Sequence, residues 1–486
     1  MTSSSSVPEA KKSPTMGLEP NSAATLNPLS NKEFLIKWGF EWQDALLFKM
    51  LLLALLITVA YGHTLDVPFY LDDYSSIAEN TYIRDIDKID ALWVSRPLRF
   101  VGYITLTINH HLHQFQVAGY HLLNILIHFL AGLTVMGVVS RLLASPNMSG
   151  RLTSEVGRWL PLIVAILFIV HPLQTQAVTY IIQRVASLAA LFYLLAIFNY
   201  LQWRLKPKLT SGLGWLALAG LCWLAGLLTK QNTATLPLAI FLLELVFFAK
   251  SPRHLFLTGL GFFFLAGGLW VLYCIAAADD MNPFSIQTFL AVFTKLNYEP
   301  PRTPSHIYFS TQLGVLFVYI KTFFYPVGLQ LERDYPLHSL LELRALGLTF
   351  AHLAILTIAA LQVRRWPLLA YGVFFYYTAH IIESSVVPIE DIIFEHRTYL
   401  PNFGLFCIVG WILVTGPQKL LTWLQSPRGD LAKQITIGLV ALLVVTLTTM
   451  TWQRNQMWRD PVVFFRSNVE QVPTKVRARA ELARVL

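Results

Sequence analysis

Residues 46–62 read LLFKMLLLALLITVAYG, a run in which Lys49 carries the single charge. A helix of this length spans the hydrocarbon core of a bilayer, because about 20 apolar residues at a rise of about 1.5 Å each reach about 30 Å. Comparable runs recur along almost the whole chain, whereas helices and strands of a soluble core would be shorter and broken by polar faces. We predict spanning helices at 46–62, 118–140, 159–171, 185–203, 211–228, 233–249, 255–276, 345–362, 367–382, 399–416 and 434–451.

Two further segments leave the number of crossings open. Segment 311–328 is apolar but contains Lys321 and lies between two polar loops, and segment 97–112 is amphipathic and is expected to lie along the membrane surface. The fold class predicted from this pattern is an all-α polytopic membrane protein with about 11–13 transmembrane helices.

Composition agrees with a membrane protein. Of the 486 residues, 55% are hydrophobic and 13% are charged, against about a quarter charged residues in soluble proteins. The formal net charge of +9 is typical of basic loops, and no basic run alternates with aromatic residues, so we expect no nucleic-acid partner. The three cysteines lie in apolar segments without metal-ligand spacing. Residues 1–44, rich in Ser, Pro and Asn, are predicted to form a disordered cytoplasmic tail before an uncleaved signal anchor.

Basic residues in short loops predict the orientation. They gather in five loops, at 141–158, 204–208, 250–253, 364–365 and 419–433. Cytoplasmic loops retain Lys and Arg, so these loops are predicted to be cytoplasmic, and all five fall on one side if 311–328 does not cross alone. The outward segments are then 63–117, 172–184, 277–344 and 383–398, with the basic tail 453–486 on the same outer side. Thirteen crossings satisfy the rule equally well.

Ionisable residues gather in the predicted outward loops, beginning with FYLDDYSSIAEN at 69–80. Asp72 and Asp73 are adjacent carboxylates about ten residues beyond the first span. Two neighbouring acids repel each other, which suits a metal, a cation, or a division between a general base and an orienting group. An ordinary solvated loop, or an aspartate that caps a short helix, would explain the pair equally well.

Further candidates occur at the ends of later spans. His171 and Arg184 are the first and last residues of HPLQTQAVTYIIQR. An arginine inside the hydrocarbon boundary requires a partner or an anion, unless its side chain extends to the interface. Lys230 lies in the short turn LLTKQNTATLP. A lysine there either lies at the membrane–water interface without a further role or belongs to a functional site. Arg96 lies in SRPLRF at 95–100.

The segment IEDIIFEHRTYLPNFG at 389–404 carries three ionisable groups directly before a span. Arg397 is suited to bidentate phosphate binding, beside His396. Glu395 is expected to orient these groups, and Tyr399 follows. Solubility alone explains such a group poorly, so we interpret it as functional.

These segments, together with YHLLNILIH at 120–128, RDYPL at 333–337 and the closing stretch 453–482, resemble a known family in their order. They are similar to the transmembrane and tetratricopeptide-repeat O-mannosyltransferase-like proteins, and especially to bacterial relatives within the GT-C superfamily of membrane glycosyltransferases. The resemblance covers about residue 45 to the end. The repeats that normally follow are not in this sequence, so we expect acceptor selection to differ or to need a partner.

The resemblance implies a GT-C-type fold with outward-facing catalytic loops. The implied reaction is inverting transfer of a sugar from a polyprenyl-phosphate donor to a hydroxyl of an exported protein, for example a pilin-like protein. Such transfer passes through an oxocarbenium-like state and needs a carboxylate to take the acceptor proton. We assign that role to Asp72 or Asp73.

We assign the leaving phosphate to Arg397, His396, Arg184, Lys230 and Arg96, with Glu395, His171 and Tyr399 as orienting residues. A divalent metal on Asp72 and Asp73 stays open, as does the sugar, whether mannose, arabinose or another. We expect a bacterial inner membrane with a periplasmic site.

Three other functions fit the sequence. A flippase or transporter of lipid-linked sugars would also place charges at membrane depth, although such proteins often have inverted repeats and broken helices near the midplane. A ligase that moves an assembled glycan onto another acceptor is a second alternative. A non-catalytic assembly protein is a third, and it would tolerate the loss of Asp72 and Asp73.

Overall fold

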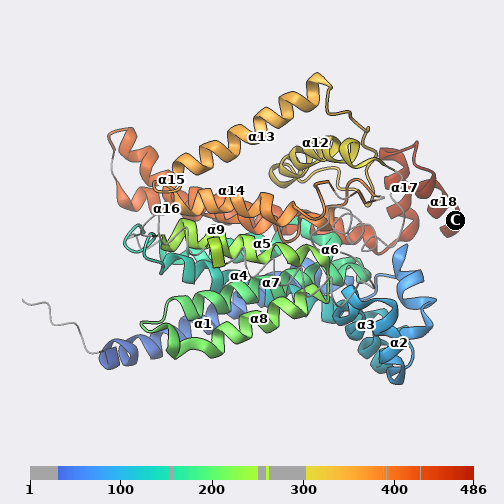
Figure 1. The fold of residues 1–486 in the computed structure, drawn as a ribbon, viewed down its shortest axis with the longest axis horizontal. Helices are drawn as coiled ribbons and strands as arrows, with labels where there is room; N and C mark the ends of the chain where they lie inside the picture. Colours follow the sequence, from blue (N-terminus) through green and yellow to red (C-terminus); the bar gives the residue numbers. More distant parts are fainter. Residues whose placement is uncertain are drawn as a thin grey trace, which may run out of the picture. The chain divides into compact units, whose positions relative to one another are not determined.

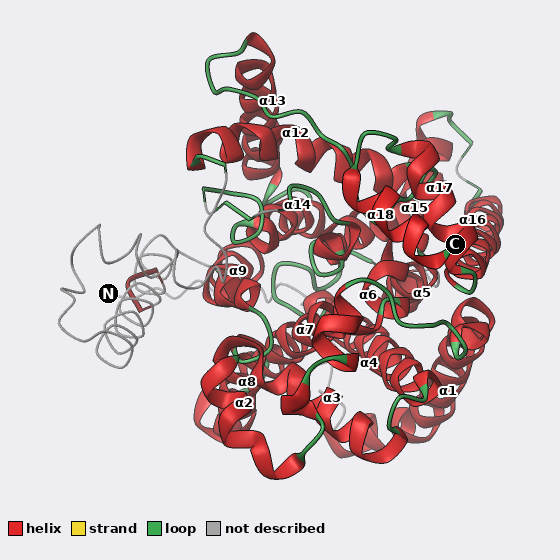
Figure 2. Ribbon diagram, turned by 90° about the vertical axis from the view of Figure 1, so that its right-hand side faces the viewer, coloured by secondary structure: helices red, strands yellow, loops and turns green. Residues whose placement is uncertain are grey.

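The computed structural model describes residues 31–152, 157–249, 259–261, 303–386, 388–389, 391–426 and 428–486. Throughout these residues the secondary structure is helical, without strands (Figure 2). The chain divides into two compact units, Met1–Lys49 and Met50–Leu486, and the helices from α2 onward lie in the second. The all-α fold class predicted from the apolar runs is confirmed.

The α-helices, labelled in Figure 1, are α1 (Asn31–Tyr61), α2 (Ile89–Ser95), α3 (Phe100–His113), α4 (Val117–Leu143), α5 (Leu160–Val170), α6 (Thr175–Thr179), α7 (Arg184–Arg204), α8 (Leu213–Leu227), α9 (Leu236–Leu243), α12 (Ser305–Phe324), α13 (Leu343–Gln362), α14 (Pro367–His380), α15 (Asn402–Trp423), α16 (Gly429–Trp458), α17 (Pro461–Gln471) and α18 (Val476–Val485). Short 3-10 or π turns connect them: η1 (Gly62–Thr64), η2 (Tyr74–Ala78), η3 (Thr81–Ile83), η4 (Ile86–Lys88), η5 (Pro97–Arg99), η6 (Gly157–Trp159), η7 (Pro172–Gln174), η8 (Ile181–Gln183), η9 (Leu209–Gly212), η10 (Gln231–Thr235), η11 (Glu244–Phe248) and η12 (Glu395–Thr398).

Within the described ranges, nine helices are long and apolar enough to cross a membrane, and each coincides with a predicted span or with segment 311–328. The predicted span 159–171 is bent instead: α5 is followed at 57° by a second piece, Pro172–Thr179, because Pro172 cannot continue the helix. Predicted span 367–382 forms the shorter helix α14. Predicted span 255–276 lies outside the described residues, apart from 259–261.

The first helix begins earlier than the sequence suggested. Residues 31–44, predicted as part of the disordered tail, form the start of α1, while residues 1–30 lie outside the described part of the chain. After Pro28 the sequence has no further proline before Pro68, so no fixed backbone angle stops the helix from extending backward from the apolar run.

Helix α12 is long and apolar enough to span a membrane, and its two ends contact the start of the loop 383–398 and the last residue of the predicted span 159–171. The Tyr308 hydroxyl near its start donates to the Glu383 carbonyl oxygen after α14, at 2.7 Å. The Phe323 carbonyl oxygen near its end lies 3.0 Å from Nε2 of His171, which follows α5. Whether segment 311–328 crosses the membrane stays a prediction.

Helices α14 and α15 pack unusually close through two glycines. A Cβ atom on Gly372 would collide with the carbonyl oxygen of Gly404, and a Cβ atom on Gly404 would collide with that of Gly372. Only glycine lets two backbones approach this far. The contact fixes the distance between the two helices that flank the loop 383–398, and so fixes that loop's place at the end of the bundle.

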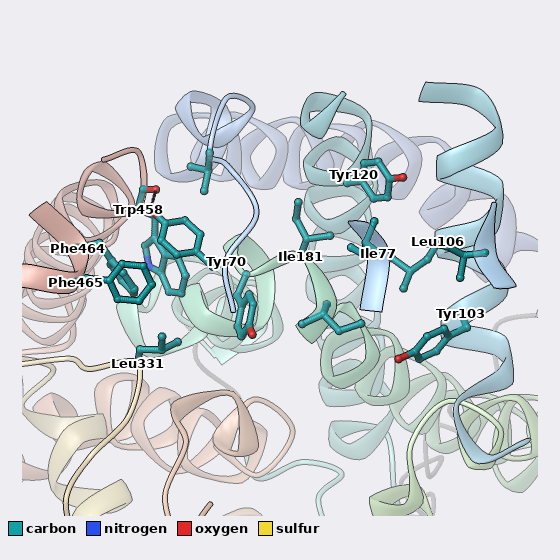
Figure 3. Close-up of a cluster of buried hydrophobic side chains, with 14 of the residues drawn as sticks. Tyr70, Ile77, Tyr103, Leu106, Tyr120, Ile181, Leu331, Trp458, Phe464 and Phe465 are labelled. Carbon is teal, nitrogen blue, oxygen red and sulfur yellow. Dashed lines mark hydrogen bonds between the residues drawn. The ribbon is translucent and has the colours of Figure 1, made fainter. Parts of the chain in front are cut away.

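The C-terminal helices fold back onto the first loop. Helices α17 and α18 lie with α2 and α3 at one end of the bundle, on the right in Figure 1 and facing the viewer in Figure 2. Tyr70 lies among Trp458, Phe464 and Phe465 (Figure 3), and its hydroxyl donates to the Trp458 carbonyl oxygen at 2.5 Å. The tail and loop 63–117 therefore share one side of the membrane, whichever side that loop faces.

Candidate active site

The two adjacent aspartates have opposite surroundings. Asp73 is fully buried: its Oδ2 accepts the Tyr70 N–H at 3.0 Å and its Oδ1 accepts the Ile182 N–H at 2.7 Å. This side chain ties the first loop to η8. Burial raises the pKa of Asp73 to about 8, although the two amide hydrogen bonds act in the opposite direction.

Asp72 points out of this packing. Its side chain is 48% exposed, and its Oδ1 accepts from Nη2 of Arg477 at 3.0 Å. Its backbone N–H donates to the Tyr180 hydroxyl at 2.8 Å. Leu71, directly before it, has a φ of 38°, a left-handed conformation that costs a residue other than glycine about 1–3 kcal/mol. Of the two neighbouring aspartates, Asp72 is therefore the accessible carboxylate.

Arg477 connects Asp72 to the loop 383–398. Its Nη1 lies 3.6 Å from Oδ1 of Asp391, so one guanidinium of α18 contacts carboxylates from two loops. We call Asp72, Asp391 and Arg477 the carboxylate cluster. Burial raises the pKa of Asp391, while Arg477 and Arg397 act to lower it. Asp391 is thus the member of the carboxylate cluster on which Arg397 acts electrostatically.

A buried ion pair adjoins Arg397. Nζ of Lys230 lies 2.6 Å from Oε1 of Glu383, with side chains only 9% and 7% exposed. Burial alone would raise the pKa of Glu383, but the nearby cations Lys230 and Arg397 hold it below its ordinary value. The pKa of Arg397 is above its ordinary value, since Tyr308, Tyr319, Glu383 and Asp391 outweigh the effect of its burial. We call Lys230, Glu383 and Arg397 the buried cation group, with one net positive charge.

Arg99 reaches the buried cation group from another loop. The Val101 N–H donates to the Leu228 carbonyl oxygen at 2.9 Å and holds η5 against the turn that carries Lys230. Arg99 is close enough to act electrostatically on Lys230 and His396. Arg96, the arginine predicted for this role, instead has its guanidinium carbon 5.8 Å from the centre of the Tyr103 ring.

The position of His396 does not support a cationic role. Its backbone N–H donates to Oε1 of Gln176 at 2.7 Å, and its Nδ1 lies 3.1 Å from the same oxygen. Since an amide oxygen only accepts, Nδ1 carries the proton. Burial and the neighbouring cations Lys230, Arg397 and Arg99 lower the pKa of His396 well below its usual range. These surroundings disfavour the charged form of the imidazole.

Glu395 contacts other partners than those expected of it. Its Oε1 accepts the Gln330 N–H at 2.7 Å and lies 3.6 Å from Nη2 of Arg333, and Arg454 is a further cationic neighbour. The structure thus does not bring Glu395 to Arg397. Glu383, twelve residues earlier in the chain, is the carboxylate beside Lys230 and Arg397.

Three predicted site residues lie in buried structural networks. Arg184 is fully buried and donates to Asn124 Oδ1 at 2.6 Å, to the Tyr120 carbonyl oxygen at 2.9 Å and to Thr105. His171 accepts the Leu173 N–H and stacks on Phe323, and the Tyr399 hydroxyl lies 2.6 Å from Nδ1 of His128. These contacts account for the three side chains without a ligand.

A divalent metal on Asp72 and Asp73 stays a prediction. Both oxygens of Asp73 accept backbone amide hydrogens, and Asp72 is paired with a cation. Across the described part of the chain, no group of three or more His, Cys, Asp and Glu side chains is arranged to hold a metal ion.

Sequence reasoning missed Glu383, Asp391, Arg99 and Arg477. A signal was present for the first, because Glu383 is a single acid directly after the apolar segment 367–382. Asp391 and Arg99 lie inside segments already selected for other residues. Arg477 lies inside the closing stretch 453–482, but its contact with Asp72 depends on the folding of the tail onto a loop 405 residues away.

Comparison with known proteins shows which proteins the chain is similar to. The chain is 24% identical to the protein O-mannosyl-transferase F38B6.6 of Caenorhabditis elegans over 468 residues, which is 90% of this chain and 60% of that protein. It is 26% identical to the protein O-mannosyl-transferase Tmtc3 of Drosophila melanogaster over 234 residues, or 43% of this chain. It is 35% identical to Tmtc2 of the same organism over 127 residues.

The matched part spans only 25% of Drosophila Tmtc3 and 12% of Tmtc2. No family model matches the chain, and no solved structure matches it. The similarity nevertheless confirms the family that the order of the motifs predicts. The chain is a multi-pass membrane protein and a relative of the TMTC-family protein O-mannosyl-transferases.

Proposed function

We propose that this protein transfers a sugar from a polyprenyl-phosphate donor to a hydroxyl of an exported protein at the outer face of the membrane. The observation that carries the proposal is the arrangement of one accessible carboxylate, Asp72, and a buried cation group linked through Asp391. Glycosyl transfer needs a base for the acceptor and cations for the leaving phosphate. The names of the relatives favour mannose as the sugar and a protein as the acceptor.

In this proposal Asp72 takes the proton from the acceptor hydroxyl. The hydroxyl oxygen forms a bond to the anomeric carbon, and the bond from that carbon to the phosphate oxygen breaks on the opposite face. The electron pair leaves with the phosphate, and the configuration at the carbon inverts. In this proposal Asp73 holds the loop in place and does not accept the proton, because both its oxygens accept hydrogen bonds from backbone amides.

Arg397 and Lys230 are the proposed phosphate ligands. Without a donor, Glu383 neutralises Lys230 at 2.6 Å. A phosphate that enters the site competes with this carboxylate for Lys230 and completes the charge balance of Arg397. Charge-assisted hydrogen bonds of this kind are the strong ones in proteins. The bacterial inner membrane and a periplasmic site stay predictions.

The test compares Asp72→Asn with the wild type in membranes supplied with polyprenyl-phosphate mannose and a candidate exported acceptor. Intact mass of the acceptor reports the transfer. We expect a hexose-sized increment with the wild type and a loss of at least a hundredfold in rate with Asp72→Asn, the usual range for a general base. Equal membrane levels and thermal unfolding control for folding. A wild-type rate in Asp72→Asn would refute the assignment of the base, and movement of the donor across the membrane without transfer would favour a flippase.

A further inference from the structure

The C-terminal helix supplies the cation of the carboxylate cluster, Arg477, which lies in the closing stretch 453–482. Arg477 is a half-buried residue of α18 and contacts Asp72 from the first loop and Asp391 from the loop 383–398. The three side chains come from segments separated by more than 80 residues at the least. Arg477 thus lies between two carboxylates that would otherwise repel each other.

Helix α18 is held firmly enough to place that guanidinium. Its Leu482 and Val485 pack against the cluster of buried side chains that contains Tyr70 and Trp458 (Figure 3). Nζ of Lys475 lies 3.4 Å from Oε1 of Glu332. These contacts fix the start and the end of the helix.

Two further contacts tie the helix to neighbouring loops. The Thr474 hydroxyl donates to Oδ2 of Asp334 at 2.8 Å. The guanidinium carbon of Arg484 lies 4.3 Å from the centre of the Tyr74 ring, two residues beyond Asp72. The helix therefore closes over the turn that carries the accessible carboxylate.

We propose that Arg477 is a positioning residue for Asp72: it holds the carboxylate in the orientation from which it takes the acceptor proton. This inference rests on the proposed function. The backbone N–H of Asp72 is fixed by the Tyr180 hydroxyl, but its side chain is half exposed, and the hydrogen bond from Arg477 restrains its carboxylate oxygen. A misplacement of about 1 Å in a reacting group can cost about a hundredfold in rate.

The test uses Arg477→Ala and Arg477→Lys in the full chain, with Arg479→Ala as the matched control. Arg479 is an exposed arginine on the same helix. We expect Arg477→Ala to lower kcat by about ten- to a hundredfold while KM for the donor stays within about twofold, because the phosphate ligands are untouched. Arg477→Lys retains a charge and should keep part of the rate. Guanidinium ion at millimolar concentration should raise the rate of Arg477→Ala but not that of Arg479→Ala.

The outcomes separate this inference from the proposed function. If the wild type shows no transfer to any acceptor, the proposed function fails and the inference fails with it. If the wild type transfers sugar and Arg477→Ala does so at an equal or higher rate, the inference alone is overturned. Equal loss in Arg477→Ala and Arg477→Lys without rescue by guanidinium ion would indicate a purely structural contact and also overturn it. Thermal unfolding of each variant identifies a folding defect. If Arg477→Ala has such a defect, the rate of Arg477→Lys tests the inference: a partial rate supports it, and a loss as large as that of Arg477→Ala overturns it.

Discussion

Replacement of Glu383 tests the buried cation group most directly. Its Oε1 lies 2.6 Å from Nζ of Lys230, a separation at which two unit charges attract by about 6 kcal/mol at an effective dielectric constant of about 20. Desolvation of the two ions offsets much of this attraction. Glu383→Gln removes the carboxylate that pairs with Lys230 and leaves that buried cation without its ion-pair partner. We expect a loss of about 3–5 kcal/mol in the free energy of unfolding, as for other broken buried pairs.

Lys230→Met should destabilise the protein by a similar amount, because it leaves Glu383 unpaired. The double variant Lys230→Met/Glu383→Leu should recover most of that loss, since an apolar pair of similar volume replaces a buried ion pair at little net cost. Thermal unfolding of the purified protein in detergent measures these differences as shifts of Tm on the order of 5 °C for a chain of this size. The cycle of single and double variants isolates the pairwise interaction.

Donor kinetics then separate stability from function. The double variant is expected to be stable but to raise KM for the polyprenyl-phosphate donor by about ten- to a hundredfold, the value of one lost charge-assisted hydrogen bond. In Glu383→Gln the two cations are free for the phosphate, so addition of donor should raise its Tm by more than it raises that of the wild type. If the double variant kept the wild-type KM, Lys230 would not be a phosphate ligand. If neither single variant lost stability, the reasoning about the buried pair would be wrong.

Other contacts make three further predictions. Burial raises the pKa of Asp73 from 3.8 to about 8, so the native state holds a proton that the unfolded state releases, and this contribution to stability is lost as pH rises through that window. The asparagine of Asp73→Asn does not titrate, so only the wild type loses this stability as pH rises. The difference in unfolding free energy between the wild type and Asp73→Asn should therefore become smaller between pH 5 and pH 8, and a constant difference would contradict the raised pKa. Arg184→Met leaves Asn124 and several backbone oxygens without their donor and should cost about 3–5 kcal/mol in chemical unfolding, whereas a ligand role alone would leave stability unchanged. The variant Arg479→Cys should react in intact cells with the same membrane-impermeant maleimide that labels Tyr82→Cys, and opposite labelling would contradict the packing of α18 on the first loop.

The order of apolar segments was accessible from the sequence because a membrane helix is a local property. Each run of about 20 apolar residues satisfies its own backbone hydrogen bonds within the bilayer and needs no partner to be recognised. The exceptions have local causes as well. Pro172 bends the third span, and the lack of proline between Pro28 and Pro68 lets α1 extend backward.

Only part of the candidate site could be predicted from the sequence. Asp72, Lys230 and Arg397 were selected because an ionisable group at the end of a span is costly and calls for an explanation. The same reasoning also selected Arg184, whose charge is satisfied by Asn124 and backbone oxygens within the bundle. Sequence cannot distinguish a buried arginine that serves packing from one that binds a ligand, since both carry the same cost of burial.

The sequence by itself determined that the chain is an all-α membrane protein and which family it resembles, because hydrophobicity and motif order are written along the chain. Only the tertiary structure decided which of two adjacent aspartates is accessible, since Asp73 accepts the N–H groups of Tyr70 and of the distant Ile182, whereas Asp72 contacts Arg477. It also decided that Glu383 rather than Glu395 accompanies Arg397, and that Arg477 of the tail reaches Asp72. These pairings depend on side chains that are distant in sequence and become neighbours only when the helices pack.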